Sequence, residues 1–222
     1  MGNRFGLMTG LRKINMARYV FFSFSYEDVR NFKVNVVRNN WLLKHKEDTF
    51  IDGSIWETAK TKGDLHIKNL IEKGLNKTSV TAALIGESTS NRRWVNYEIV
   101  KSFERGNGIL GIYIKRIRGK DGYIGSRGHN PLDRLAFEIS EDGRKISFYE
   151  LHNGKWYVFD DLPEINNKKS NTLYFENSFW SGNEFGEFYK FSDKFETYCW
   201  DYDNGNMNFS DWIEDAAEQA GR

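Results

Sequence analysis

The feature that most constrains this chain is the alternation of short apolar runs with amphipathic segments across its first half. Nearly continuous apolar runs occur at Tyr19–Phe24, Ser79–Ile85 and Ile109–Ile114. Runs of this length are typical of strands buried on both faces of a parallel sheet. Thr49–Ile55 is a weaker strand candidate. Strands that alternate with helices predict an α/β domain with right-handed crossovers.

The segments between these runs carry apolar side chains at helical spacing. One helix is expected from about Glu27 to Lys46 and a second from Asp64 to Gly74. A third helix follows a polar loop and places Val95, Ile99 and Phe103 on one side at four-residue steps. These apolar sides predict helices that pack on the faces of the sheet.

Ligands of open parallel sheets bind beyond the carboxyl ends of the strands, where loops lead into helices. In this chain those loops are Phe24–Glu27, Ile55–Asp64 and Gly86–Arg93. Any binding or catalytic residues are therefore expected on these loops or in the first turns of the helices that follow.

From about Lys115 the alternation ends and aromatic segments follow. Two such segments flank Asn153-Gly154, which is a strong signal for a β-hairpin. We expect the hairpin to extend or cap the edge of the sheet. The predicted organisation is an N-terminal extension (1–16), an α/β domain (17–140), a C-terminal extension packed on that domain (141–213) and a flexible tail (214–222).

Composition excludes several classes of function. The 32 basic and 31 acidic residues leave a net charge of +1, so no overall field favours nucleic acid or an anionic membrane. No apolar run is long enough to cross a membrane. Cys199 is the single cysteine, which excludes an internal disulfide framework and fits a reducing cytoplasm. The four histidines lack metal-ligand spacing, so no metal site is expected.

Glu98 is the carboxylate with the most informative surroundings. It lies four residues after Trp94 and shares a helix face with it. We expect Glu98 at the edge of the core, near the loop Gly86–Arg93. A glutamate on a helix is usually solvated, so position alone does not establish a role.

Two segments resemble the motifs of TIR domains. Val20–Asp28 resembles the opening V-F-x-S-F/Y strand and its acidic loop, and Trp94–Ile99 resembles the motif W-C-x-x-E-L, whose glutamate cleaves NAD. The resemblance covers most of Ala17 to Trp212 and implies a flavodoxin-like TIR fold, with a central parallel sheet flanked by helices. Segments that resemble the ThsB-type TIR proteins of Thoeris antiphage systems are Val34–Asn39, Asn76–Thr81, Asn91–Val95, Asn130-Pro131 and the hairpin Asn153–Trp156.

The chain departs from the TIR pattern at two positions. Ser25 stands where plant TIR domains commonly have arginine, which leaves open how the phosphates of NAD are held. Val95 replaces the cysteine after the tryptophan, a change that we expect to alter only packing.

The resemblance implies an enzyme that breaks the nicotinamide–ribose bond of NAD, with Glu98 as the catalytic residue. The cationic nicotinamide is a good leaving group, so the enzyme must mainly stabilise an oxocarbenium-like ribose. Attack by water would give ADP-ribose. Attack by a hydroxyl of the adenosine ribose would give a cyclic ADP-ribose isomer, as the ThsB resemblance implies. That product would activate a separate effector of the ThsA type. NAD is then the substrate, and no cofactor is expected.

Substrate contacts are expected on the three loops and beside Glu98. Phe24 and Trp56 are candidate flat surfaces for the bases, and core packing is an equally good interpretation of both. Trp94 is a further candidate because it shares the face of Glu98. Residues that could contact a ribose or a phosphate are Ser25, Asp52, Ser54 and Lys62.

Two other classes of function stay open at this point. A non-enzymatic TIR adaptor would act through protein assembly alone. A receiver-like or flavodoxin-like module would bind phosphate or flavin, with Asp52 as phosphate acceptor, although its usual acidic pair is displaced to Glu27 and Asp28. TIR enzymes commonly need two or more copies to complete their site, so the resemblance also allows a homo-oligomer on activation.

Overall fold

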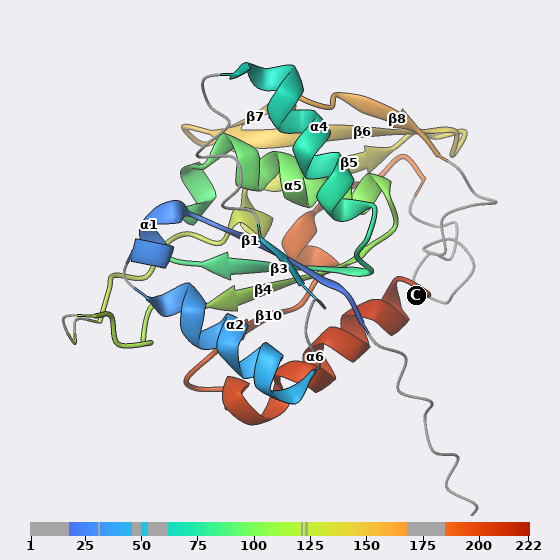
Figure 1. Ribbon diagram of the computed structural model, residues 1–222. Helices are drawn as coiled ribbons and strands as arrows, with labels where there is room; N and C mark the ends of the chain where they lie inside the picture. Colours follow the sequence, from blue (N-terminus) through green and yellow to red (C-terminus); the bar gives the residue numbers. More distant parts are fainter. Residues whose placement is uncertain are drawn as a thin grey trace, which may run out of the picture.

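A five-stranded parallel sheet forms the centre of the molecule (Figure 1). The computed structural model describes residues 18–30, 32–45, 50–52, 62–120, 122, 124–167 and 185–222, and only the backbone of 30 and 50–52. In spatial order the strands are β10 (Thr197–Cys199), β4 (Gly108–Tyr113), β3 (Val80–Ile85), β1 (Val20–Phe24) and β2 (Phe50–Asp52). β1 and β3 are buried along their whole length, which confirms the prediction from their apolar runs.

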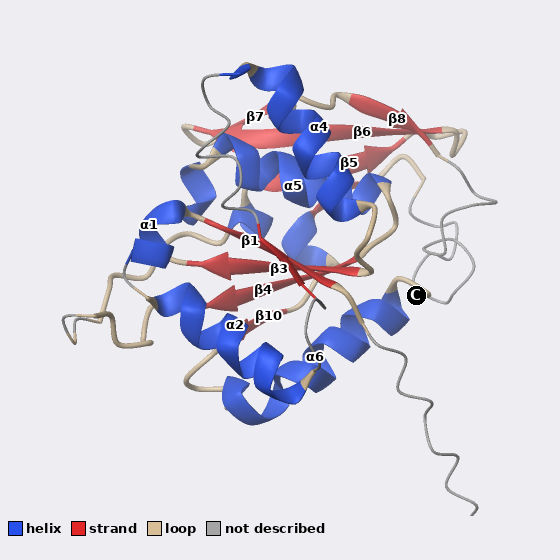
Figure 2. Cartoon of the chain, viewed as in Figure 1, coloured by secondary structure: helices blue, strands red, loops and turns tan. Residues whose placement is uncertain are grey.

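Helices cover both faces of this sheet (Figure 2). The helices α2 (Lys33–Lys44) and α6 (Gly205–Gln219) lie on one face, and α4 (Asp64–Leu75) and α5 (Arg93–Glu104) lie on the other. Side chains of a strand point alternately to its two faces. Phe22 therefore packs with Phe209 of α6, whereas Phe21 packs in the core on the side of α5.

The first helical segment differs from the single helix predicted over 27–46. The structure has α1 (Tyr26–Arg30) and then α2, with Phe32 between them in the left-handed region at φ 62°. The amide of Phe32 donates to the carbonyl oxygen of Val29 at 2.8 Å, which closes a tight turn. This turn redirects the chain so that α2 buries Trp41 against the sheet. The apolar spacing predicted the helical residues but not this break.

A second, antiparallel sheet packs on the outer side of α5 (Figure 1). Its elements are β5 (Leu135–Ile139), β6 (Lys145–His152), β7 (Lys155–Val158), β8 (Glu164–Asn166) and β9 (Phe188–Lys190), in the order β7-β6-β5-β9 with β8 also paired to β6. The β6–β7 hairpin confirms the predicted turn, because Asn153 and Gly154 have φ of 50° and 77°.

The prediction that this hairpin extends or caps the parallel sheet is wrong. It belongs to the second sheet because α5 has apolar side chains on two sides. Phe103 of α5 points away from the parallel sheet and meets Phe137 of β5 at a ring distance of 4.9 Å and Phe148 of β6 at 5.6 Å. The helix is thus packed between two sheets, and the predicted domain boundary at residue 140 falls between the paired strands β5 and β6.

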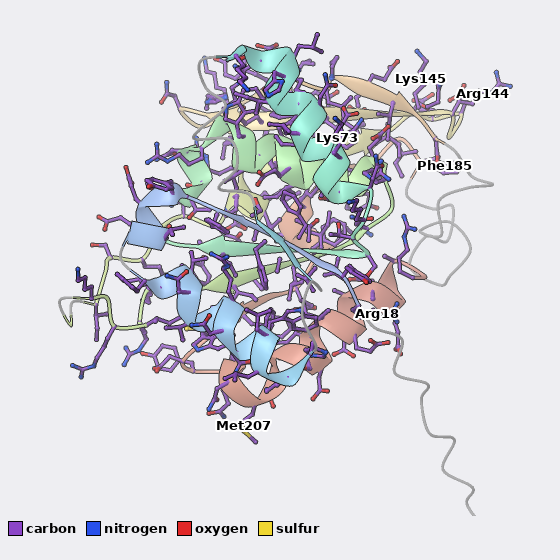
Figure 3. The ribbon with its side chains drawn as sticks, viewed as in Figure 1. Arg18, Lys73, Arg144, Lys145, Phe185 and Met207 are labelled. Carbon is purple, nitrogen blue, oxygen red and sulfur yellow. The ribbon has the colours of Figure 1, made fainter. Side chains whose placement is uncertain are left out.

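The C-terminal segment completes the central sheet. β10 pairs with β4 in parallel, and α6 buries Ile213 and Ala217 on the sheet. Residues 214–222, predicted to be a flexible tail, therefore include the last turns of a packed helix. Arg18 pairs with Glu214 of α6 and ties this helix to the chain before β1 (Figure 3). The predicted N-terminal extension (1–16) lies outside the described residues. Among the helices that the structure describes, none is long and apolar enough to cross a membrane.

Candidate catalytic site

Glu98 lies between α5 and β1, deeper than predicted from the sequence. Its exposed fraction is 1%, and the hydroxyl of Ser23 donates a hydrogen bond to its Oε2 atom. Ser23 is buried on β1, on the strand face that α5 covers. The expectation of a residue at the edge of the core is therefore wrong. A carboxylate so removed from water is a costly arrangement, and it requires hydrogen-bond donors.

The turn of α5 that carries Glu98 is also held through its backbone. The Ser102 hydroxyl donates to the carbonyl oxygen of Glu98 at 2.6 Å and lies 2.7 Å from the Thr81 hydroxyl of β3. All three residues are buried. The position of Glu98 relative to β1 and β3 is thus determined by contacts to both its side chain and its main chain.

The loops after β1 and β3 meet at the carboxyl edge of the sheet, near Ser23 and Glu98. The hydroxyls of Ser25 and Ser88 lie 3.2 Å apart, and Ser88 donates to Glu27 at 2.8 Å. Arg92, directly before α5, forms an ion pair with Glu27 at 2.7 Å and a hydrogen bond with Ser88 at 3.3 Å. Ser25 follows directly after β1, two residues beyond Ser23, so this polar network lies next to the Ser23–Glu98 contact in the chain.

A pocket of about 280 Å³ opens at this edge. Its volume is near the lower end of the range for small-molecule sites, roughly 300 Å³, which suits one ribose or one base better than a whole dinucleotide. Lys33 is buried here, and its ammonium donates to the carbonyl oxygen of Lys115 at 3.1 Å. The residues that line the pocket are Glu27, Asp28, Lys33, Gly86, Glu87, Ser88, Lys115, Gly125 and Ser126.

Asp28 is a titratable group of this pocket whose pKa is strongly shifted. Burial raises its pKa to about 6, although a hydrogen bond from Thr89 at 3.3 Å acts in the opposite direction. Its carboxylate packs directly on Gly86, where a Cβ atom would lie 2.1 Å from both carboxylate oxygens. Glycine at position 86 is therefore required by the close approach of Asp28.

This arrangement predicts a pH dependence of stability. The pKa of Asp28 is higher in the folded protein, about 6, than its ordinary value of 3.8, so the folded state binds more protons between these values. The free energy of unfolding should fall as pH rises from 4 to 6, by about 3 kcal/mol at about 1.4 kcal/mol per pH unit. Asp28→Asn should remove this slope, because asparagine does not titrate. At pH 8 it should stabilise the protein by about 1–3 kcal/mol, because a buried charge is removed while the hydrogen bond from Thr89 is altered.

Urea unfolding from pH 4 to pH 8 measures the effect. Asp142→Asn is the control. A hydrogen bond from Ser140 lowers the pKa of the exposed Asp142, so removing this carboxylate should change the pH dependence of stability in the direction opposite to Asp28→Asn. Parallel pH curves for the wild type and Asp28→Asn would contradict the assignment.

A larger groove of about 780 Å³ lies on the other side of α5. It is bordered by the start of α5 and by the β6–β7 hairpin, and Asn96 of α5 donates to Glu150 there. Glu98 instead faces β1, so this groove is separate from the Glu98 contact. The groove is lined by Asn91, Arg93, Glu150, His152, Tyr157, Val158, Phe159, Asp160 and Asp161. The smaller pocket is the better candidate site because it lies at the carboxyl edge of the parallel sheet.

The structure brings together only some of the residues predicted for substrate binding. Ser25 lies at the carboxyl edge, in the network above Glu98. Phe24 is buried in the core on the opposite face, among the side chains of α2 and α6, so the core interpretation applies to it. Trp94 is partly buried, with the Arg93 guanidinium 4.5 Å from its ring centre and Tyr97 edge-on at 6.1 Å.

The other residues predicted to contact the substrate lie at the end of β2, in the segment after it, or just before α4. Asp52 ends β2, and its backbone pairs with Phe22 of β1. Lys62 is exposed before the start of α4. Ser54 and Trp56 lie outside the described residues. In the part of the chain that the structure describes, no three His, Cys, Asp or Glu side chains are placed to hold a metal ion.

Sequence reasoning missed three residues of this site, which are Ser23, Ser88 and Arg92. A signal existed for Ser23, because it is the single hydroxyl side chain within the buried run Val20–Phe24. Ser88 and Arg92 lie in the predicted loop Gly86–Arg93, but nothing in their spacing indicated that they would contact Glu27.

Comparison with known proteins agrees with this architecture. The family model described as "Thoeris protein ThsB, TIR-like domain" matches residues 21–118, which hold β1 to β4 and Glu98. A protein of Bacillus cereus (strain MSX-D12), named "Putative cyclic ADP-D-ribose synthase ThsB1", is 44% identical over 202 residues, 89% of this chain and 100% of that protein. This second match therefore extends beyond residues 21–118 into the C-terminal half of the chain. This chain belongs to the ThsB family, the TIR-domain proteins of Thoeris systems.

Proposed function

We propose that this protein cleaves the nicotinamide–ribose bond of NAD and closes the remaining ADP-ribose into a cyclic isomer. The observation that carries the proposal is the position of Glu98, a buried carboxylate held at the carboxyl end of β1 by Ser23. The name of the 44% identical relative, a cyclic ADP-D-ribose synthase, supports the same reaction. The family also disfavours the receiver-like and flavin-binding alternatives.

The chemistry follows from the charges of substrate and enzyme. As the glycosidic bond breaks, its electron pair moves to the pyridinium nitrogen, and nicotinamide leaves as a neutral molecule. Positive charge then develops on the ribose. A carboxylate in a site with little water stabilises that charge more strongly than it would in solution. We assign this role to Glu98.

A hydroxyl of the adenosine ribose completes the reaction in this proposal. Its oxygen forms the new bond to the ribose carbon, and its proton is released, so that one NAD yields one cyclic product, nicotinamide and a proton. Water in the same position would yield ADP-ribose. The adenosine end must therefore fold back toward Glu98, which requires a cleft that excludes water.

The polar edge of the sheet suits the ribose and the phosphates. We propose that Arg92 supplies the positive charge that Ser25 lacks. Arg92 is close to Ser25 because it forms a hydrogen bond with Ser88, whose hydroxyl contacts that of Ser25, and an ion pair with Glu27. Ser25 and Ser88 can exchange hydrogen bonds with hydroxyls of the sugar. Trp94 remains our proposal for a flat contact with a base, and Asp52, Ser54, Trp56 and Lys62 remain proposed contacts from the loop after β2.

The cyclic product fits a role as a signal. We propose that it activates a separate ThsA-type effector in antiphage defence and that the enzyme acts in the cytoplasm, where NAD is available. A homo-oligomer on activation is compatible with this proposal, as in other TIR enzymes.

Product analysis tests the proposal directly. The purified protein is incubated with NAD, alone and with lysate of phage-infected cells, since a defence enzyme can be inactive without its trigger. We expect free nicotinamide together with a product that is lighter than ADP-ribose by one water. ADP-ribose alone would indicate a simple NAD hydrolase, and no nicotinamide under either condition would favour a non-enzymatic adaptor.

A further inference from the structure

We infer that Ser23 is the positioning residue for Glu98, so that the hydroxyl on β1 determines where the catalytic carboxylate points. The inference rests on the proposed function of Glu98 and adds a residue to it. Ser23 itself is fully buried, and its hydroxyl donates to the carboxylate of Glu98. We therefore expect it to act on the reaction through Glu98.

The surroundings of the pair explain why a donor is needed. Glu98 is buried on α5 between Val95 and Ile99, which belong with Phe21 to the apolar core on this side of the sheet. A carboxylate in such a setting loses its hydration and retains its charge at lower cost when a hydroxyl donates to it.

The remaining freedom of Glu98 lies in its side chain. Its backbone is already held, because Ser102 donates to its carbonyl oxygen and contacts Thr81 of β3. The side-chain torsions of a glutamate are nevertheless free unless its carboxylate is also bonded, and each arrangement aims the charge differently. Ser23 restricts these torsions from the neighbouring strand. The two serines thus act on different parts of the same residue.

Loss of the hydroxyl should therefore lower turnover more than substrate binding. A misplacement of about 1 Å costs on the order of 10²-fold in rate when geometry controls the reaction. We expect Ser23→Ala to lower kcat for nicotinamide release by about 10- to 100-fold, with KM changed by less than about 2-fold. Ser23→Thr keeps the hydroxyl on a β-branched side chain that strands accept, and it should restore most of kcat.

The matched control removes a buried hydroxyl far from Glu98. Thr78 precedes β3 at the opposite edge of the sheet and donates to the carbonyl oxygen of Leu75 at 3.1 Å. Thr78→Val keeps its shape and removes the same chemical group. We expect this variant to lower the melting temperature slightly and to leave kcat unchanged.

A double-mutant cycle with Glu98→Gln decides between a direct and an indirect effect. In the Glu98→Gln background, Ser23→Ala should cause no further loss of kcat, because the group it positions is gone. Wild-type kcat in Ser23→Ala, with Glu98→Gln inactive, would overturn the inference and leave the proposed function intact. If the wild type released no nicotinamide, the proposed function would fail. Melting temperatures of the wild type, Ser23→Ala, Glu98→Ala and the double variant would still decide the inference, because alanine at position 98 removes the acceptor of the Ser23 bond, and additive shifts would show that Ser23 does not hold residue 98.

Discussion

Replacing Glu98 with glutamine is expected to lower the rate of nicotinamide release by at least about 10²- to 10³-fold. Removal of one preorganised electrostatic group has effects of this size in other enzymes. The substitution keeps the shape of the side chain and removes its charge, so the ribose cation loses its stabilising partner. The measurement is nicotinamide release from NAD under the condition in which the wild type is active.

The folded structure should survive this substitution. The amide oxygen of glutamine can still accept the hydrogen bond from Ser23, and a neutral group is less costly to bury than a carboxylate. We therefore expect a melting temperature equal to or above that of the wild type. This separates a catalytic loss from unfolding.

A second glutamate of the same helix provides the control. Glu104 lies in the last turn of α5, where it pairs with Lys101 at 2.8 Å. Glu104→Gln removes the same charge from the same helix but away from β1, and its activity should stay within about 2-fold of the wild type. Equal activity of Glu98→Gln and the wild type would place the chemistry elsewhere.

Replacing Phe103 with alanine is expected to destabilise the protein by about 3–5 kcal/mol, the range for loss of a large buried aromatic side chain. Phe103 joins α5 to the second sheet. Its ring contacts those of Phe137, Phe148 and Phe191 at centroid distances of 4.9, 5.6 and 5.4 Å. A cavity at this position would lie where several elements meet, so the surroundings cannot easily collapse into it.

Chemical unfolding of the two proteins, with the same probe and the same fitted slope, measures this difference. Phe188→Ala is the control, because Phe188 belongs to the same second sheet but keeps 40% of its surface exposed. Its loss should be about 1 kcal/mol, since the apolar area returned to water is smaller. Similar losses in the two variants would mean that α5 and the second sheet are not joined through Phe103.

Local patterns in the sequence predicted the central part of the fold. Continuous apolar runs predicted β1, β3 and β4, and the four-residue spacing of apolar residues predicted the helix α5. The Asn-Gly pair predicted the hairpin of β6 and β7 because both residues adopt positive φ readily. The resemblance of Trp94–Ile99 to a TIR motif identified Glu98.

The same patterns did not predict the structure where a helix packs between two sheets or where the chain makes an unusual turn. Phe103 was expected to pack on the parallel sheet, but it packs on the second sheet, since the spacing of apolar residues does not identify the surface that they meet. The left-handed residue Phe32 was missed because a phenylalanine with positive φ carries no local sequence signal. β10 was missed because it is short and pairs with a strand far away in the chain.

The amino-acid sequence by itself thus determined the strand–helix alternation and the hairpin, which depend on side-chain periodicity and backbone preference acting over a few residues. Glu98 was singled out as the candidate catalytic residue by the resemblance of its segment to a TIR motif. Tertiary structure alone decided that Glu98 is buried against Ser23 and that Arg92 and Ser88 join Glu27 at the edge of the sheet. Those contacts connect residues more than 60 positions apart, so they depend on how strands and helices pack rather than on any local pattern.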